Sequence, residues 1–416
     1  MPWALRVRRL ARLLLACLVA GVLSGVAGAA LTLVLEAVQR ATLGYRDGTF
    51  ETAIQHTPPA RIVIAFTLGG LLSGLGWWAL RRRRRVPSLR SVVVEPVDND
   101  RLTVVSLDAL LQVLFVGAGG SVGREGAPRQ LAAGLTSRVL GTTRLDGADL
   151  QVLVAAGAGA GLAAVYTTPV AGAIFALEIV LARWSTRALA LALLVSGLAT
   201  LVARPVTHDA TTYRWPGGEL TLTDIGWSVA VIPLAAGLGL LFVQLIRGAR
   251  PHRQRHVGVW VTLAALTVGL TATVLPAIPG NGKAVIQDVL VGHPDVLTLA
   301  ALTLAKPVVT GLCLRAGATG GVLTPALATG AAAGGAVALI ASGFGIHAEL
   351  ATWALVAAAA VLAVSQDAPF FAVAFAWELT RPSLWLLIPI AVAAFGAWVA
   401  TRWAGVLPTD RPPTRS

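Results

Sequence analysis

The sequence predicts an all-α, polytopic membrane protein in which two halves of the chain repeat each other. Hydrophobic residues make up 56% of the 416-residue chain and charged residues only 13%, and the mean hydropathy is +0.75. Apolar runs of about 20 residues recur along the chain, which is the length that crosses a bilayer as an α-helix. Short motifs of the first half return in the second half.

The basic residues predict the orientation of the chain in the membrane. The net charge is +13, and Lys283 and Lys306 are the only lysines among 33 basic residues. Arginines cluster beside apolar runs at Arg6–Arg12, Arg81–Arg85 and Arg250–Arg255. The positive-inside rule assigns such clusters to the cytoplasmic side, and it explains them better than nucleic-acid binding does. We therefore expect a multi-pass protein of the plasma membrane, embedded in the lipid bilayer, with a cytoplasmic N-terminus and no nucleic-acid partner.

The first half of the membrane domain is expected at about residues 10–203, after a cytoplasmic N-terminus of residues 1–9. Its first apolar run is too long for a secretory signal and predicts a retained spanning helix. Several later segments are too short to cross and predict half-spanning helices, which transporters use to bring helix ends to the bilayer midplane. The predicted segments are Leu10–Val38, Ile62–Leu80, Ser88–Val94, Leu102–Val116, Glu125–Leu140, Leu150–Val165, Pro169–Leu181 and Arg187–Val202.

The second half is expected at about residues 223–404, so that the whole membrane domain covers 10–404. A polar segment precedes it, and residues 405–416 are expected to form a disordered tail. The predicted apolar segments are Ile225–Ile246, Val257–Ala277, Val296–Leu314, Leu350–Val364, Pro369–Thr380 and Leu384–Trp403, with a short amphipathic piece and a second glycine-rich lead-in among them.

A glycine-rich stretch from Gly117 to Gly134 places Arg124 and Glu125 in an otherwise apolar part of the chain. Ionisable residues at membrane depth are costly and are functional candidates by default. Gly and Pro around them predict an irregular lead-in, followed by a helix that begins near Glu125. The free N–H groups and the positive dipole of a helix start favour an anion, either a dissolved ion or the Glu125 carboxylate.

Two motifs recur at nearly constant offsets in the two halves. Pro169 and Glu178 return as Pro369 and Glu378, 200 residues later, and the glycine-rich motif at Gly123 has a counterpart at Gly320, 197 residues later. Repeated halves with interrupted helices at matching positions indicate a transport site at their interface. The helix starts near Glu125 and Val322 would then point at one place.

Three of these segments resemble the CLC family of chloride channels and chloride/proton exchangers. They are GREGA at Gly123–Ala127, TGGVLTP at Thr319–Pro325, and the segment from Thr167 to Glu178. The resemblance runs from about Leu10 to Trp403. It implies a CLC-like inverted repeat of tilted and half-spanning helices, and a homodimer in which each subunit conducts chloride or a related anion.

The resemblance also implies roles for individual residues. Glu125 would be the gating glutamate, whose carboxylate occupies the outer anion site and leaves it on protonation. Backbone donors near Gly126 in the first half, with Gly123 and Arg124 of the same motif, would face the outer anion. Those of the second half, Val322, Leu323 and Thr324, would face the central anion. Such donors bind an anion without the full positive charge that would trap it.

The sequence departs from the family pattern at three places. RRRVP at Arg83–Pro87 replaces the motif whose serine contacts the central anion, and the final helix with its anion-binding tyrosine has no match, since Tyr45, Tyr166 and Tyr213 lie elsewhere. Glu178 matches the first of two exchanger glutamates, as a candidate for the proton pathway, but Ile179 replaces the second, the proton acceptor. We therefore expect an uncoupled chloride channel.

Alternatives remain open at this point. A proton-coupled chloride antiporter and a fluoride- or nitrate-selective member share the same motifs, and a non-conducting scaffold could keep the fold. Arg124 and Glu125 could pair structurally, and Glu178 and Glu378 could be interfacial charges. Cys17 and Cys313 lie in apolar runs, and the six histidines show no metal-ligand spacing. We expect no metal, no cofactor and no enzymatic activity.

Overall fold

The computed structural model describes residues 3–143, 145–208, 211–218, 221–249, 256–292 and 294–405. The Arg250–Arg255 cluster and residues 406–416 of the expected tail lie outside these ranges. The first half consists of α1 (Trp3–Leu43), α2 (Phe50–His56), α3 (Pro59–Arg83), α4 (Leu89–Val94), α5 (Asn99–Gly117), α6 (Gly126–Leu140), α7 (Gly147–Tyr166), α8 (Pro169–Phe175), the π-helical η1 (Ala176–Leu181) and α9 (Thr186–Thr207).

The second half follows the same plan. It consists of α10 (Leu222–Ala230), α11 (Ile232–Ile246), α12 (Val257–Ala272), α13 (Lys283–Val291), α14 (Val296–Arg315), α15 (Leu323–Gly343), α16 (Leu350–Gln366), α17 (Pro369–Thr380), the 3₁₀ turn η3 (Leu384–Leu386) and α18 (Leu387–Trp403). In the described part of the chain, seven helices are long and apolar enough to cross a membrane, or eight if the bent pair α10–α11 is one span. The expected all-helical, multi-span architecture is confirmed.

Two predicted segments differ from the structure in an informative way. Residues 225–246, expected as one helix, belong to α10 and α11, which meet at Val231 with a bend of 45°. Pro233 supplies a reason, because its ring prevents the helix from continuing straight through that turn. The polar connection after the first span also holds a helix, α2, whose start is fixed by a capping box between Thr49 and Thr52.

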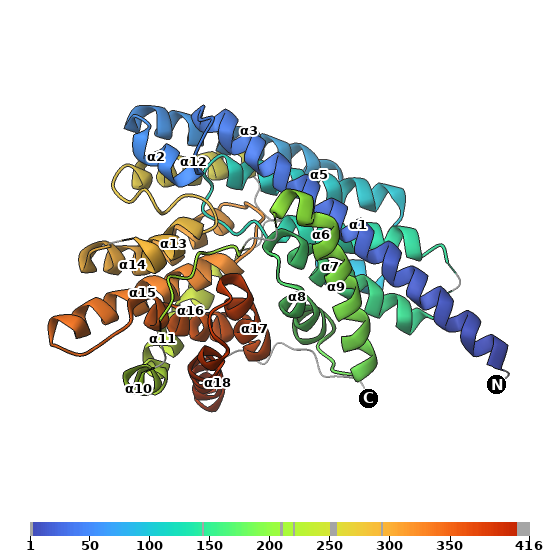
Figure 1. Cartoon of the computed structure of the whole chain (residues 1–416). Helices are drawn as coiled ribbons and strands as arrows, with labels where there is room; N and C mark the ends of the chain where they lie inside the picture. Colours follow the sequence, from blue (N-terminus) through green and yellow to red (C-terminus); the bar gives the residue numbers. More distant parts are fainter. Residues whose placement is uncertain are drawn as a thin grey trace.

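The two halves meet near the centre of the molecule, where the starts of α6 and α15 approach each other (Figure 1). The spans α7 and α15 lie innermost, with 83% of the apolar window of each buried. Small residues allow this close packing: a Cβ on Gly159 of α7 would overlap the carbonyl oxygen of Gly172 on α8. α15, which begins at the second glycine-rich motif, is thus one of the innermost spans, and α6, which follows the first motif, packs against the other, α7.

Reciprocal contacts join the repeated motifs of the two halves. The Glu178 carboxylate in η1 accepts hydrogen bonds from the N–H groups of Phe370 (3.3 Å) and Phe371 (2.7 Å) at the start of α17. The Glu378 carboxylate in α17 accepts them from Val170 (3.0 Å) and Ala171 (2.6 Å) at the start of α8. Each half thus caps a helix of the other, as two halves related by a pseudo-two-fold axis would.

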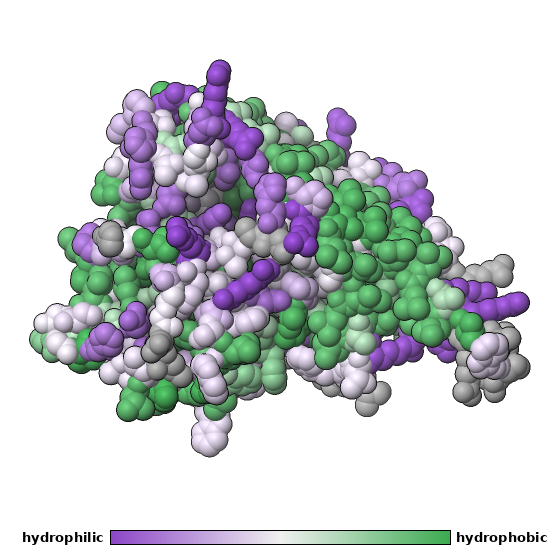
Figure 2. All heavy atoms as spheres, in the orientation of Figure 1, coloured by the Kyte–Doolittle hydropathy of each residue, from purple (hydrophilic) through white to green (hydrophobic). Residues whose placement is uncertain are grey.

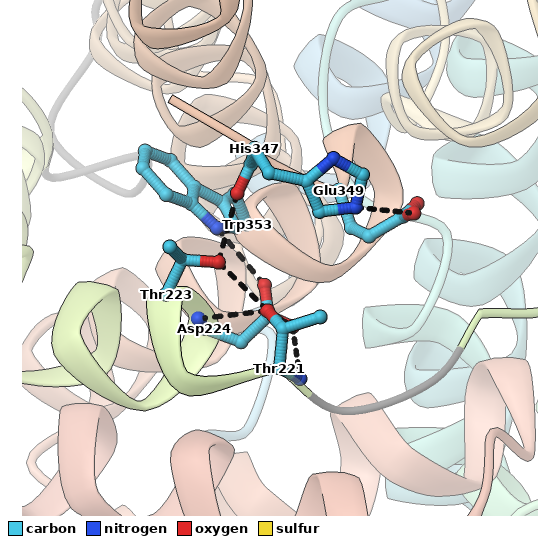
Figure 3. Close-up of polar contacts among 6 residues, drawn as sticks. All are labelled: Thr221, Thr223, Asp224, His347, Glu349 and Trp353. Carbon is cyan, nitrogen blue, oxygen red and sulfur yellow. Dashed lines mark hydrogen bonds and ion pairs between the residues drawn. The ribbon is translucent and has the colours of Figure 1, made fainter. Parts of the chain in front are cut away.

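A polar cluster ties α10 to α16 (Figure 3). Asp224 closes a capping box with Thr221 at the start of α10, and its Oδ1 accepts a hydrogen bond of 3.0 Å from Trp353 Nε1. Trp227 returns the contact, because its Nε1 donates to the Trp353 carbonyl at 3.1 Å and the two rings stack with centroids 4.4 Å apart. This cluster is structural: it positions the bent pair α10–α11 beside α16.

The surface agrees with a membrane setting. Figure 2 shows a broad hydrophobic area over α1 and α9, where Leu15, Leu33 and Leu201 are each more than half exposed. Exposed apolar side chains on such helices suit contact with lipid. Hydrophilic side chains gather toward the middle of the same face (Figure 2).

Candidate functional site

The two glycine-rich motifs meet in a short antiparallel bridge. The N–H of Gly123 donates to the carbonyl of Gly321, and the N–H of Gly321 donates to the carbonyl of Gly123, both at 2.7 Å. The partner of Gly123 is therefore Gly321, one residue after the Gly320 with which the sequence comparison aligned it. This bridge places the starts of α6 and α15 on either side of one position, as the repeat predicted.

A basic side chain anchors each glycine-rich loop. Lys306 of α14 is fully buried, and its Nζ donates to Ser121 Oγ at 2.9 Å and to the carbonyls of Ile278 and Gly280 at 2.8 Å. Arg81 of α3 donates to Thr319 Oγ1 at 2.6 Å. Ser121 and Thr319 each lie two residues before a bridging glycine, so the two loops are held in matching ways. Sequence analysis did not assign either anchor.

The Glu125 carboxylate lies at the start of α15. Its Oε1 accepts hydrogen bonds from the N–H groups of Leu323 (2.6 Å) and Thr324 (3.4 Å). Its Oε2 accepts hydrogen bonds from Thr324 Oγ1 (3.1 Å) and the Tyr166 hydroxyl (3.3 Å). Glu125 is fully buried. A buried carboxylate with four donors at a helix start occupies a position that suits an anion.

The bridging glycines make room for this carboxylate. A Cβ on either Gly123 or Gly321 would overlap the Glu125 side chain. The neighbouring Gly126 is confined as well, because its Cβ would overlap Oε1 of Gln112. Glycine is needed at Gly123 and Gly321 for close approach to the occupant of the site, and at Gly126 for close approach to Gln112.

Tyr166 has no predicted role, because its position in the sequence does not match that of the family's anion-binding tyrosine. Tyr166 ends α7, and its hydroxyl reaches Glu125 from there. The guanidinium of Arg124 lies over its ring at 4.6 Å, and Phe375 packs edge-on at 5.5 Å. The available signal was the polar group of Tyr166 itself, since it interrupts an apolar run directly before the TTP segment.

Comparison with known proteins decides the family. Residues 69–402 match the family model described as voltage gated chloride channel. A putative chloride channel protein, ClcB-like, from Ralstonia nicotianae is 31% identical over 412 residues, which cover 92% of this chain and 93% of the relative. The chain belongs to the CLC family. This is a family of anion channels and transporters and not of enzymes.

Other CLC relatives are named as exchangers. The H(+)/Cl(-) exchange transporter ClcA of Citrobacter koseri is 26% identical over 425 residues, covering 95% of this chain and 86% of the relative. Among solved structures, a slow cyanobacterial Cl−/H+ antiporter matches with a TM-score of 0.80 at 20% identity, covering 95% of this chain and 96% of the other. A CLC-type fluoride/proton antiporter matches with a TM-score of 0.70 at 22% identity, covering 94% and 96%. These likenesses show the CLC fold.

A cavity of about 560 Å³ opens beside the CLC motif and forms a vestibule to it. Arg124 and Asn281 line it, and the hydroxyl of Tyr166 accepts a hydrogen bond of 3.3 Å from Asn281 Nδ2. The cationic residues in its lining are Arg40, Arg124, Arg214 and Lys283. Glu36 and Glu51 also line it, and Arg40 pairs with Glu36 at 3.3 Å, but the cationic side chains outnumber these carboxyls, which favours the approach of anions.

Glu51 lines this vestibule, and its carboxyl is paired with that of Asp288. The Glu51 carboxyl on α2 hydrogen-bonds to that of Asp288 on α13. Burial, together with the charge of Asp288 and this hydrogen bond, raises the pKa of Glu51 to about 8. Burial also raises the pKa of Asp288. The pair therefore retains a proton at neutral pH.

A buried polar network lies next to the CLC glutamate motif. Asp108 of α5 is fully buried and accepts hydrogen bonds from Trp77 Nε1 (2.9 Å) and Gln112 Nε2 (2.7 Å). Gln130 of α6 accepts a second bond from Gln112 and donates to the carbonyl of Pro87 at 3.1 Å. The segment that lacks the family serine is thus fixed to α6 through Pro87.

The predicted site residues fall into two groups. Glu125, Leu323 and Thr324 come together directly, so the carboxylate lies on donors expected for the central anion rather than at the expected outer position. Gly123, Arg124, Gly126 and Val322 lie around them on the two helix starts, but the N–H of Gly123 donates to the Gly321 carbonyl and does not face the anion as expected. Glu178 forms the second group: its carboxylate caps the start of α17.

Proposed function

We propose that this protein exchanges chloride for protons, with Glu125 as both gate and proton carrier. The observation that supports this most is the position of the Glu125 carboxylate at the start of α15, where it takes the donors that an anion would use. The names of several relatives favour exchange over simple conduction. Proton-coupled exchange and simple conduction are both forms of CLC anion transport.

Electrostatics explains how such a gate would operate. The carboxylate is a tethered anion, so chloride entering from the vestibule competes with it for the N–H groups of Leu323 and Thr324. Protonation neutralises the carboxylate and weakens its hold on these groups, which lets the side chain leave. A chloride ion that occupies the vacated position disfavours the return of the charged side chain. Proton binding and chloride binding are thereby coupled.

An uncoupled chloride channel is the second candidate, and it was the expectation from the sequence. Ile179 follows Glu178 in η1 and offers no titratable group. Glu178 itself caps α17, which accounts for a glutamate there without proton transfer. One relative is named a putative chloride channel. The anion could also be fluoride or nitrate, and a non-conducting scaffold is the remaining alternative.

We further propose a homodimer in the plasma membrane with a cytoplasmic N-terminus. In this orientation the vestibule faces outward, because α1 and α3 bring their arginine-rich ends, Arg6–Arg12 and Arg81–Arg85, to the cytoplasmic side. The exposed apolar faces of the helices would be covered by lipid and by the second subunit.

The decisive experiment measures anion and proton movement together. Purified protein in liposomes is given a chloride gradient, and chloride efflux and external pH are recorded with and without a potassium ionophore. Proton uptake in a fixed ratio to chloride efflux supports exchange, whereas efflux without proton movement supports the channel. Glu125→Ala should abolish proton movement but retain chloride flux. Absence of any chloride, fluoride or nitrate flux in the native protein would refute both.

A further inference from the structure

The two oxygens of the Glu125 carboxylate are held by chemically different donors. Oε1 is bound by backbone N–H groups, with Leu323 at 2.6 Å and Thr324 at 3.4 Å. Oε2 is bound by two side-chain hydroxyls, with Thr324 Oγ1 at 3.1 Å and Tyr166 at 3.3 Å. Since the carboxylate stands in for the transported ion, an ion at this position would meet the same four donors.

The Tyr166 hydroxyl is oriented before any ion arrives. It accepts a hydrogen bond of 3.3 Å from Asn281 Nδ2, which directs its one proton toward Glu125. The ring is fixed by the Arg124 guanidinium on its face at 4.6 Å and by Phe375 at its edge at 5.5 Å. Tyr166 is fully buried. A pre-oriented donor loses little entropy when it binds an anion.

The Thr324 hydroxyl supplements it from the opposite half of the protein. Thr324 lies in the first turn of α15 and is fully buried. The site therefore combines one hydroxyl from each half, and both converge on the same carboxylate oxygen.

We propose that Tyr166, together with the hydroxyl of Thr324, is a ligand of the transported anion and sets its selectivity. This inference rests on the proposed anion transport. Chloride and fluoride are strongly hydrated and need strong donors to replace their water, whereas nitrate needs them less. Two added O–H groups beside the backbone donors therefore favour halide over nitrate.

Binding of the ion can be measured apart from gating. In the Glu125→Ala background the competing carboxylate is absent, and chloride binding is followed by isothermal titration calorimetry in detergent. Adding Tyr166→Phe removes one hydrogen bond to a charged ligand, and we expect the Kd for chloride to rise about tenfold. Thr324→Val removes the other hydroxyl at nearly equal volume and should have a similar effect.

Tyr213→Phe is the matched control. Tyr213 is also fully buried, but its hydroxyl has no hydrogen-bond partner among the described residues. Tyr213 lies close enough to interact electrostatically with Tyr166, Arg124 and Glu125, but its hydroxyl makes no hydrogen bond to them. This variant therefore removes a nearby phenolic oxygen without removing a hydrogen-bond donor from the Glu125 carboxylate, and the Kd for chloride should stay unchanged. In liposomes, the ratio of nitrate to chloride flux should rise in Tyr166→Phe and remain native in Tyr213→Phe.

The results separate this inference from the proposed function. Suppose that Glu125→Ala binds chloride, and that adding Tyr166→Phe changes neither the Kd for chloride nor the nitrate-to-chloride flux ratio, as expected for Tyr213→Phe. Tyr166 is then not a ligand of the anion, although the proposed anion transport still holds. If neither the native protein nor Glu125→Ala transports or binds any anion, the proposed function fails first. Should Tyr166→Phe not fold, Thr324→Val gives an independent answer: a native Kd and flux ratio would overturn the hydroxyl site.

Discussion

At the scale of single residues, the site depends on an unusual concentration of buried polar groups around one carboxylate. Glu125 is fully buried, and its partners come from both halves of the chain. Burying a carboxylate is costly unless hydrogen bonds replace its water. The four donors supply these bonds, and the same donors make the position attractive to a mobile anion.

Gly321 tests whether this position is needed for transport. A Cβ there would overlap the Glu125 carboxylate, so Gly321→Ala should exclude either occupant, the side chain or the ion. We expect chloride flux to fall at least about tenfold. The same decrease is expected in the Glu125→Ala background, because the added methyl group fills the space that the anion would need. Gly197→Ala is the control, since a Cβ at Gly197 meets nothing within 4 Å. Native flux in Gly321→Ala/Glu125→Ala would place the anion elsewhere.

At the scale of elements, the two halves hold each other through their helix starts. Glu178 caps α17 and Glu378 caps α8, with two backbone N–H groups each. Carboxylates at helix starts are stabilised by the free N–H groups and the helix dipole. These contacts explain both glutamates as parts of the scaffold that joins α8 and η1 of the first half to α17 of the second half.

Removal of either cap should therefore destabilise the protein by a comparable amount. We expect Glu178→Ala and Glu378→Ala each to cost about 1 kcal/mol or more, the typical value of a lost cap. Thermal unfolding in detergent measures this, with Glu→Gln variants at the same positions as controls that keep an acceptor. Native stability in Glu178→Ala would contradict the cap. Loss of proton coupling in liposomes by a stable Glu178→Gln would assign Glu178 to the proton pathway as well.

The contact between α2 and α13 should make stability depend on pH. The pKa of Glu51 is raised from 4.5 to about 8, chiefly by burial and then by Asp288. The folded protein therefore keeps a proton that the unfolded chain releases, and stability should decrease as the pH rises from about 4.5 to about 8. Glu51→Gln should reduce this decrease in unfolding temperature, whereas Glu95→Gln, away from this pair, should preserve it. An unchanged pH profile in Glu51→Gln would contradict the assignment.

At the scale of the whole molecule, the repeat explains how far sequence reasoning could go. The motifs around Glu125 and Leu323 could be predicted from the local sequence, because residue types alone indicate a glycine-rich lead-in and a helix start. The contact of Tyr166 with Glu125 could not be predicted, since it depends on how α7 packs against α6. The Lys306–Ser121 and Arg81–Thr319 anchors depend in the same way on packing between distant segments.

Local composition also limited the fold prediction. The helix α2 was missed because its stability comes from a capping box and from contacts across the vestibule, rather than from an apolar run. The bend at Val231 interrupts a continuous apolar run, which hydropathy alone treats as one span. The motif predicts Glu178 as a candidate for the proton pathway, and this stays a prediction. Its cap of α17 could not be predicted, because it depends on how η1 packs beside α17.

The central claim is that the Glu125 carboxylate occupies the position of the transported anion. Crystals of Glu125→Ala grown with bromide test it most directly, because bromide scatters X-rays anomalously. We predict an anomalous peak within hydrogen-bonding distance of Leu323 N and the Thr324 and Tyr166 hydroxyls. Bromide bound elsewhere along the pathway, with this position empty in the variant, would contradict the claim.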